Sequence, residues 1–171
     1  IKSGSINADY SSYTVGKTND LDIETDYTKS IIEIAENITY NCDYGSLTVE
    51  KANNIKGDSD YLTLRIGEVY KNVSVTADYG SMKINNMTSN AGDVNIESDF
   101  MKITIGYSSG YNFDFDLDLS YASLRGDNEL EISKRIEKSS SKKYSGYHGS
   151  KGSGNTINIT SDYGSVTFNK N

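Results

Sequence analysis

Hydrophobic and polar residues alternate along most of this chain, in short runs that end at an acidic-aromatic pair. In the clearest run, Ile157 and Ile159 alternate with polar neighbours up to the pair that ends at Tyr163. Val166 and Phe168 then continue the alternation with their parity shifted by one position. Period-2 alternation is typical of a strand with one buried face, and a parity change requires one extra residue at a bend. The pattern therefore predicts two strands joined by a corner.

This two-strand unit recurs with a nearly constant period. The successive steps between pairs are 17, 17, 17, 18, 21 and 21, and the last step is twice as long. The copies are Asp9-Tyr10, Asp26-Tyr27, Asp43-Tyr44, Asp60-Tyr61, Asp78-Tyr79, Asp99-Phe100, Ser120-Tyr121 and Asp162-Tyr163. A period of roughly 20 residues that fills the chain is typical of a solenoid. We predict an all-β fold, a single-stranded parallel β-helix (β-solenoid) with about eight coils of 17–21 residues and right-handed coiling.

Inward-facing columns follow from the same register. Branched apolar residues dominate six and four positions before each aromatic residue, and small residues dominate two positions before it. Cys42 occupies one of the small positions, so we expect a buried, inert thiol. The aromatic residue keeps the same parity, so the column is expected to be stacked inside the coils. Its expected buried members are Tyr27, Tyr44, Tyr61, Tyr79 and Phe100.

One stretch departs from the repeat, where the step between pairs doubles. A run rich in Ser, Lys and Gly occupies 138–154. That composition is typical of a mobile surface loop, and a long excursion from a regular scaffold often carries function. We therefore expect one β-solenoid domain over 1–171, with a loop excursion at about 127–155.

Composition supports a strand-rich chain and excludes some functions. There is no Pro, which suits strands because Pro lacks the amide that a ladder needs. The net charge of −7 disfavours binding to nucleic acid, which requires cations that neutralise phosphates. No apolar run reaches the roughly 18 residues of a transmembrane segment. A single Cys cannot form an internal disulfide.

The N-terminal residues suggest how the protein is delivered. The chain as given contains no signal peptide, and Ile1 already lies within the first repeat. We expect that a signal or anchor has been removed upstream. The expected localisation is outside the cytoplasm, at the cell surface, the outer membrane or the periplasm.

The Asp column has two interpretations. Aspartates on neighbouring coils repel each other by about 1 kcal/mol per pair in water, so something must offset the repulsion. Each carboxylate could accept a hydrogen bond from an amide two or three residues further on, in an Asx-type turn. Alternatively, Ca²⁺ could bind between coils with six to eight oxygen ligands. We favour the turn and expect no metal, no cofactor and no cation between Asp43, Asp60 and Asp78.

A basic and aromatic group in the excursion is the candidate ligand-binding site. Lys142, Lys143, Tyr144 and Tyr147 could bind an anionic glycan or a partner protein, or could simply be solvated. His148, the only histidine, completes the group. No fixed Ser, Cys or carboxylate partner for His148 is visible, and catalysis needs such held geometry. We therefore predict no catalytic residues.

The repeated core also carries a family resemblance. The segment Ile-x-Ile-x-Ser-Asp-Tyr-Gly-Ser-Val-x-Phe at 157–168 is echoed at 73–84 and 94–105. It resembles the adhesin-like domains of bacterial surface proteins, a group of unknown function related to auto-transporter-adhesin-like head domains. The resemblance covers nearly the whole chain and is weakest over 126–154. It implies a β-helix, export to the cell envelope and an adhesin role, and it supplies no catalytic residues.

Three functional hypotheses remain open. The first is a non-enzymatic surface domain that binds a glycan or a protein, with weak or end-to-end self-association. The second is a structural envelope spacer without a ligand. The third is a polysaccharide-cleaving enzyme, which we rank last because no cluster of Asp, Lys and Arg is visible and fold analogy alone justifies little. An exposed aromatic or basic cleft would favour binding, whereas a uniform polar surface would favour a spacer.

Overall fold

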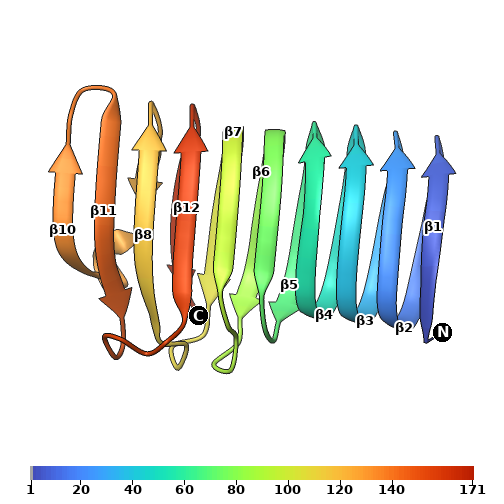
Figure 1. Ribbon diagram of the computed structural model, residues 1–171, viewed down its shortest axis with the longest axis horizontal. Coiled ribbons are helices and arrows are strands. Elements are labelled where there is room, and N and C mark those ends of the chain that lie inside the picture. Colours follow the sequence, from blue (N-terminus) through green and yellow to red (C-terminus); the bar gives the residue numbers. More distant parts are fainter. Residues whose placement is uncertain (1) are drawn as a thin grey trace.

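The chain forms a parallel β-solenoid, which confirms the predicted fold class. The computed structural model describes residues 2–171 and shows coils stacked side by side along one long axis (Figure 1). Thirteen strands join into one continuous sheet that wraps from one side of the stack to the other. The number and hand of the coils stay predictions.

The chain contains thirteen strands and one short 3-10 helix in the described residues. The strands are β1 (Ser3–Asp9), β2 (Ser12–Asp26), β3 (Lys29–Asp43), β4 (Gly45–Asp60), β5 (Leu62–Val69), β6 (Val73–Met87), β7 (Val94–Tyr107), β8 (Phe113–Ser120), β9 (Ser123–Arg125), β10 (Glu131–Glu137), β11 (Ser141–His148), β12 (Thr156–Asp162) and β13 (Ser165–Lys170). The helix η1 covers Asp127–Glu129.

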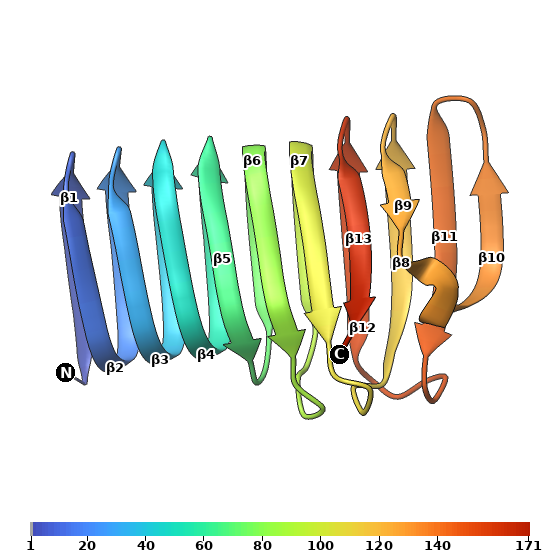
Figure 2. The ribbon, with the colours of Figure 1, turned by 180° about the vertical axis from the view of Figure 1, so that it is seen from behind.

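Each coil contributes to two layers that pack back to back. The front layer contains β1, β12, β8, the second halves of β2, β3 and β4, and the first halves of β6 and β7 (Figure 1). The rear layer contains β5, β13, β9 and the remaining halves (Figure 2). Because the parallel strands pair in register, residues at equivalent positions of successive coils lie above one another. The inward positions, such as Ile38, Leu47, Ile66 and Val94, are therefore fully buried in one core.

The corner between the layers lies at the aromatic residue itself. All eight aromatic residues of the repeat have φ between 49° and 54°, in the left-handed region. Such a residue turns the chain, so the Asp before it and the aromatic side chain both face outward. The next position points inward again, as buried Thr28, Leu62 and Met101 show.

The prediction that the aromatic column is buried is therefore wrong. These side chains are 43–79% exposed. Side chains alternate between inward and outward only where the backbone is extended. The prediction counts the aromatic residue as extended, whereas its backbone is left-handed. The expected stacking is present, but it runs along the outside edge of the solenoid. Cys42, by contrast, is buried as predicted, and this burial raises the pKa of its thiol.

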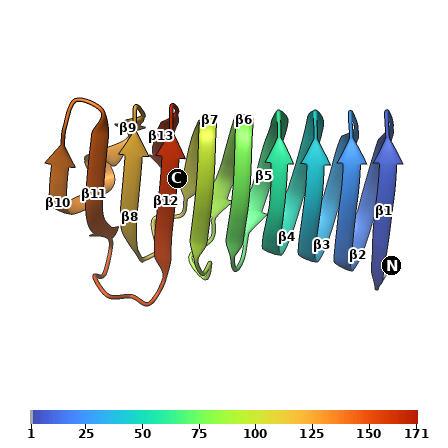
Figure 3. The same cartoon turned by 45° about the horizontal axis from the view of Figure 1, so that its top comes forward.

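The order of coils in space differs from their order in the chain. Strand β12 of the C-terminal coil pairs in parallel with β7 on one side and with β8 on the other. In the rear layer, β13 likewise pairs with β7 and β9. Figure 3 shows the C-terminal coil between its two neighbours. The C-terminal coil thus lies between the coils of β7 and β8, which follow each other in the sequence.

Part of the predicted loop excursion is a β-hairpin. Strands β10 and β11 pair antiparallel with each other, and β11 pairs antiparallel with β8. The prediction of a mobile loop over 138–154 is wrong for 141–148, which carries buried Tyr144 and His148. The hairpin extends the front layer beyond β8 (Figure 1). None of the helical segments in residues 2–171 has the length and apolarity to cross a membrane.

Candidate binding surfaces

An aromatic ridge runs along one edge of the solenoid. In spatial order its members are Tyr10, Tyr27, Tyr44, Tyr61, Tyr79, Phe100, Tyr163 and Tyr121. Neighbouring ring centroids are 4.8–4.9 Å apart, and the ring planes differ by 1–7°. This spacing equals the distance between hydrogen-bonded strands, because each coil supplies one ring.

The ridge presents ring edges and hydroxyl groups rather than ring faces. Each inner ring is covered on both faces by its neighbours, so only the two end rings have an open face. A ligand on the side of the ridge would meet phenol hydroxyls and the edges of the rings. Aromatic quadrupoles place positive potential at ring edges, so the ridge favours hydrogen-bonding partners over flat stacking ones.

The backbone at the ridge is strained. A non-glycine residue in the left-handed region costs about 1–2 kcal/mol, and this cost recurs at all eight coils. Each stacked pair returns about 0.5–1.5 kcal/mol, so strain and stacking nearly cancel. Gly or Asn at these positions would give the same corner with less strain. Partial burial of the rings adds to the stacking energy, so the fold itself gains from an aromatic residue at this corner.

An Asp column runs beside the ridge on the front layer. In spatial order it contains Asp9, Asp26, Asp43, Asp60, Asp78, Asp99 and Asp162, with Ser120 at the end. Desolvation, followed by the charges of Asp43 and Asp78, raises the pKa of Asp60. Desolvation and the charges of Asp78 and Asp162 raise that of Asp99. The repulsion expected from the sequence is therefore present.

Hydrogen bonds between coils offset part of this repulsion. The Asp43 carboxylate accepts from the Asp60 amide at 2.9 Å, and the Asp78 carboxylate accepts from the Asp99 amide at 3.1 Å. These bonds reach the next coil, so for these two residues the expected bond to an amide two or three positions further on is wrong. Within residues 2–171, no three His, Cys, Asp or Glu side chains are arranged to hold a metal ion.

The opposite edge of the front layer has a ladder of polar side chains. The Asn37 amide donates to Asp20 at 2.7 Å, Asn54 donates to Asn37 at 2.8 Å, and Asn72 donates to Asn54 at 3.1 Å. Asp93 continues the ladder by accepting from the amide of Thr156, which belongs to the inserted coil. These side chains satisfy one another, so this edge stabilises the stack and offers few free groups to a ligand.

The five residues predicted as a ligand site do not form one exposed patch. Tyr144 is buried, its hydroxyl donates to Glu137, and its ring lies 5.2 Å from the Arg135 guanidinium carbon. Lys143 forms an ion pair with Asp118 on β8. Lys142 and Tyr147 are half-buried, and neither belongs to the core.

His148 is a packing residue. Its Nδ1 lies 2.7 Å from the carbonyl oxygen of Tyr111, a distance that fits an N–H donor. Its ring packs against Tyr107 and Phe113, at centroid distances of 4.8 and 5.5 Å. The alternation of Tyr144, Gly146 and His148 with residues that face outward was the sequence signal for this strand.

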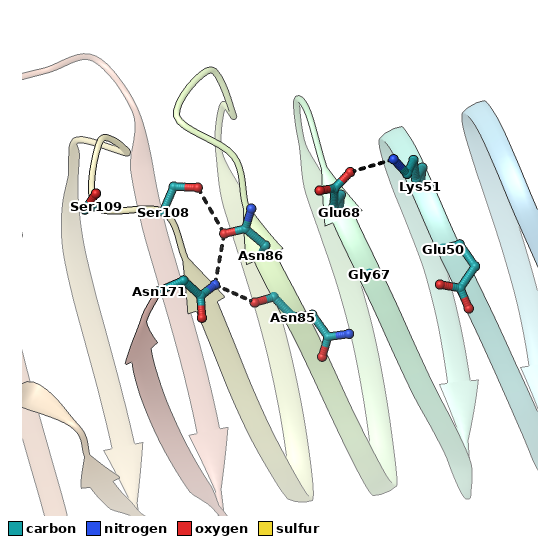
Figure 4. Close-up of a pocket in the computed structure, with 9 residues that line it drawn as sticks. All are labelled: Glu50, Lys51, Gly67, Glu68, Asn85, Asn86, Ser108, Ser109 and Asn171. Atoms are coloured by element: carbon teal, nitrogen blue, oxygen red, sulfur yellow. Dashed lines mark hydrogen bonds and ion pairs between the residues drawn. The ribbon is translucent and has the colours of Figure 1, made fainter.

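A shallow polar depression lies over the rear layer near the C-terminus (Figure 4). Its volume is about 660 Å³, and its lining includes Glu68, Asn85, Ser109 and the residues drawn beside them. Its side chains are largely paired, since Lys51 bridges to Glu68 at 3.1 Å and Asn171 donates to Asn86 at 3.0 Å. The lining contains no Ser, His and carboxylate arrangement of the kind that nucleophilic catalysis requires.

Comparisons with known proteins add no family assignment. No protein-family model matches the chain, and no curated protein or solved structure gives a significant match.

Proposed function

We propose that this protein is a non-enzymatic β-solenoid of the bacterial cell surface or envelope, an adhesin-like module that binds a glycan or a protein through its aromatic ridge. The Asp column beside the ridge would contribute carboxylates to the same surface. Tyrosine hydroxyls and aspartates hydrogen-bond to sugar hydroxyls and to the amides and cations of proteins. The resemblance to adhesin-like domains supports the same assignment.

The exposed area of the ridge carries this proposal. A fully exposed aromatic side chain presents about 200 Å², and the ridge residues are 43–79% exposed. Eight such residues in one line expose on the order of 800 Å². The largest apolar patch on a typical monomer is about 300–600 Å² and is often functional. An exposed aromatic surface of this size favours a binding role over a spacer.

The geometry of the Asp column supports a binding module rather than an enzyme. Four of its seven aspartates are exposed and the other three are half-buried, so water reaches the carboxylates along the column. Hydrolysis of a glycosidic bond by paired carboxylates needs a site that encloses the sugar and controls the position of water. The column could hydrogen-bond a polymer, but it could not exclude water from one.

Substitution within the ridge tests the proposal. We would replace Tyr44, Tyr61 and Tyr79 together by Asn, which tolerates the left-handed region. The labelled wild-type protein and the variant would be applied to arrays of neutral and acidic glycans and to intact bacterial and host cells. We expect the wild type to bind at least one of these surfaces and the triple variant to lose at least about tenfold in affinity, about 1.4 kcal/mol.

A matched control separates the ridge from other exposed tyrosines. Tyr70 is 37% exposed but lies outside the ridge, where its hydroxyl donates to Glu68. Tyr70→Asn should bind like the wild type. Equal binding by the ridge variant would place the ligand site elsewhere. If the wild type binds none of the surfaces, the spacer hypothesis is preferred. Protease accessibility of the full-length gene product on intact cells tests the proposed location.

A further inference from the structure

The rear layer carries a basic face, made of two outward columns. One column contains Ser12, Lys29, Ser46, Thr63, Ser81, Lys102, Ser165 and Ser123, and the other contains Thr14, Ile31, Thr48, Arg65, Lys83, Thr104, Thr167 and Arg125. These columns contain five cations and no carboxylate. Apart from Ile31, every other member carries a hydroxyl group. Glu33 and Glu50 lie just beyond the second column, where the face ends.

The front layer carries an acidic face of the opposite character. It consists of the Asp column and the two outward columns beside it, which add Glu24, Asp58, Glu97, Asp118, Asp22 and Asp116. The only cation in these three columns is Lys56. The net charge of −7 therefore conceals a strong separation of charge between the two faces.

The cations of the basic face lack partners within the described chain. All five are exposed, and the ion pairs of Lys51, Arg135, Lys143 and Lys170 lie outside the two columns. Arg65 and Lys83 lie directly opposite each other on adjacent coils. Like charges opposite each other on neighbouring strands are destabilising, and no carboxylate within the two columns offsets them.

We propose that the basic face of one molecule docks on the acidic face of a second copy of this chain. Both faces are built on the same coil spacing, which the ridge rings measure as 4.8–4.9 Å. The cations of one face and the carboxylates of the other are therefore spaced by the same interval along the whole contact. Complementary potentials of this kind fix the partner and the register of an interface.

A second copy fits the basic face better than a membrane or a free polyanion. The two columns contain one apolar side chain, Ile31, so the face has little to insert into a bilayer. A polyanion would match the five cations but would leave the acidic face unused and would be repelled by the net charge. A second copy pairs both faces at once. The two contacting surfaces differ, so the contact is heterologous and leaves one free face of each kind, which allows stacks to grow.

Two complementary variants test this interface. The basic-face variant carries Arg65→Glu, Lys83→Glu and Lys102→Glu, and keeps the acidic face intact. The acidic-face variant carries Glu24→Lys, Asp58→Lys and Glu97→Lys, and leaves the Asp column intact. Lys71→Glu, Lys134→Glu and Lys138→Glu together form a control with the same change in net charge as the basic-face variant, outside both faces. Circular dichroism would verify folding, and Gln substitutions at the same basic positions would replace Glu if folding failed.

Sedimentation velocity across concentration reads out the result. The wild type and the control should form concentration-dependent stacks that dissociate near 1 M salt, where the Debye length falls to about 3 Å. Each face variant alone should associate at least about tenfold more weakly. An equimolar mixture of the two variants restores one native contact and places the introduced Glu and Lys side chains on facing surfaces, so it should associate at least about tenfold more strongly than either variant alone.

Several results would overturn the proposal. A wild type that stays monomeric at every concentration would do so. Equal loss of association in the control would show that net charge, not the basic face, matters. Stacks that persist in the basic-face variant would place the contact elsewhere. A monomeric wild type that binds dextran sulfate, with binding lost in the basic-face variant, would identify a polyanion as the occupant.

Discussion

Tyr61 lies in the middle of the ridge, and the free energy of unfolding lost on its replacement depends on its left-handed backbone conformation. Its ring stacks on Tyr44 and Tyr79 at 4.8 Å, with interplanar angles of 5° and 7°, and the residue is 49% exposed. Two stacks are worth about 1–3 kcal/mol beyond burial. Roughly 100 Å² of buried ring adds at most about 2.5 kcal/mol. Tyr61→Ala should therefore lower the free energy of unfolding by about 2–4 kcal/mol.

Glycine at the same position should be the milder change. Tyr61→Gly loses the same stacking but removes about 1–2 kcal/mol of left-handed strain. The extra freedom of Gly in the unfolded chain costs about 0.5–1 kcal/mol. Tyr61→Gly should therefore be roughly 0.5–1 kcal/mol more stable than Tyr61→Ala. Urea denaturation of the three proteins, with closely similar m values, measures this difference.

An extended position on the same coil supplies the matched control. Thr63 faces outward from β5, so Thr63→Gly should be less stable than Thr63→Ala by about 0.5–1 kcal/mol. The order of Ala and Gly should thus be opposite at the two positions. If Ala is the more stable replacement at Tyr61 as well, the left-handed corner is wrong. A loss for Tyr61→Ala below about 0.5 kcal/mol, the lower limit for a single aromatic pair, would show that stacking contributes nothing.

Three further substitutions test the other parts of the structure. Asp60→Asn should stabilise the fold by a few tenths of a kcal/mol at pH 7, and this gain should shrink towards pH 3, since desolvation and then the neighbouring carboxylates raise the pKa of Asp60. Burial raises the pKa of Tyr107 to about 12, so only the unfolded chain loses this proton from pH 10 upward. Titration of Tyr107 alone should reduce stability by roughly 2–3 kcal/mol between pH 10 and 12, so Tyr107→Phe should lose that much less stability than the wild type in pH-dependent denaturation. His148→Ala should cost about 2–4 kcal/mol in urea, through lost packing and the bond to Tyr111, whereas Lys151→Ala should change stability by less than about 0.5 kcal/mol.

The fold could be predicted because its signal repeats. Columns of apolar residues at fixed positions before each aromatic residue indicate strands with one buried face, and Ile38, Tyr40 and Cys42 are all buried as this register requires. The direction of the aromatic side chains could not be predicted by counting. One residue in the left-handed region shifts all parity after it. The apolar residues directly after the aromatic ones, such as Leu62 and Met101, were the signal for an inward position there.

The insertion of the last coil could not be predicted from the repeat alone. Parallel pairing of β12 with β7 and β8 uses the same residue pattern as pairing with a coil that is adjacent in sequence. The step from Tyr121 to Tyr163, twice as long as the step before it, is the only sequence signal that relates to this insertion. The hairpin was missed for a different reason. Lys143 and Ser145 occupy outward positions of β11, and Gly146 stands between its two buried residues, Tyr144 and His148, so the alternation of apolar residues is hard to recognise.

The position of the tyrosines relative to solvent is the most direct test of the ridge. Tetranitromethane would be applied briefly to the folded protein, and nitrated tyrosines would be identified by peptide mass spectrometry. We expect fast nitration of the ridge tyrosines, which are at least 43% exposed, and slow nitration of Tyr40, Tyr107 and Tyr111, which are at most 2% exposed. Protection of Tyr44, Tyr61 and Tyr79 to the level of Tyr40 would contradict this expectation, because the aromatic column would then belong to the core.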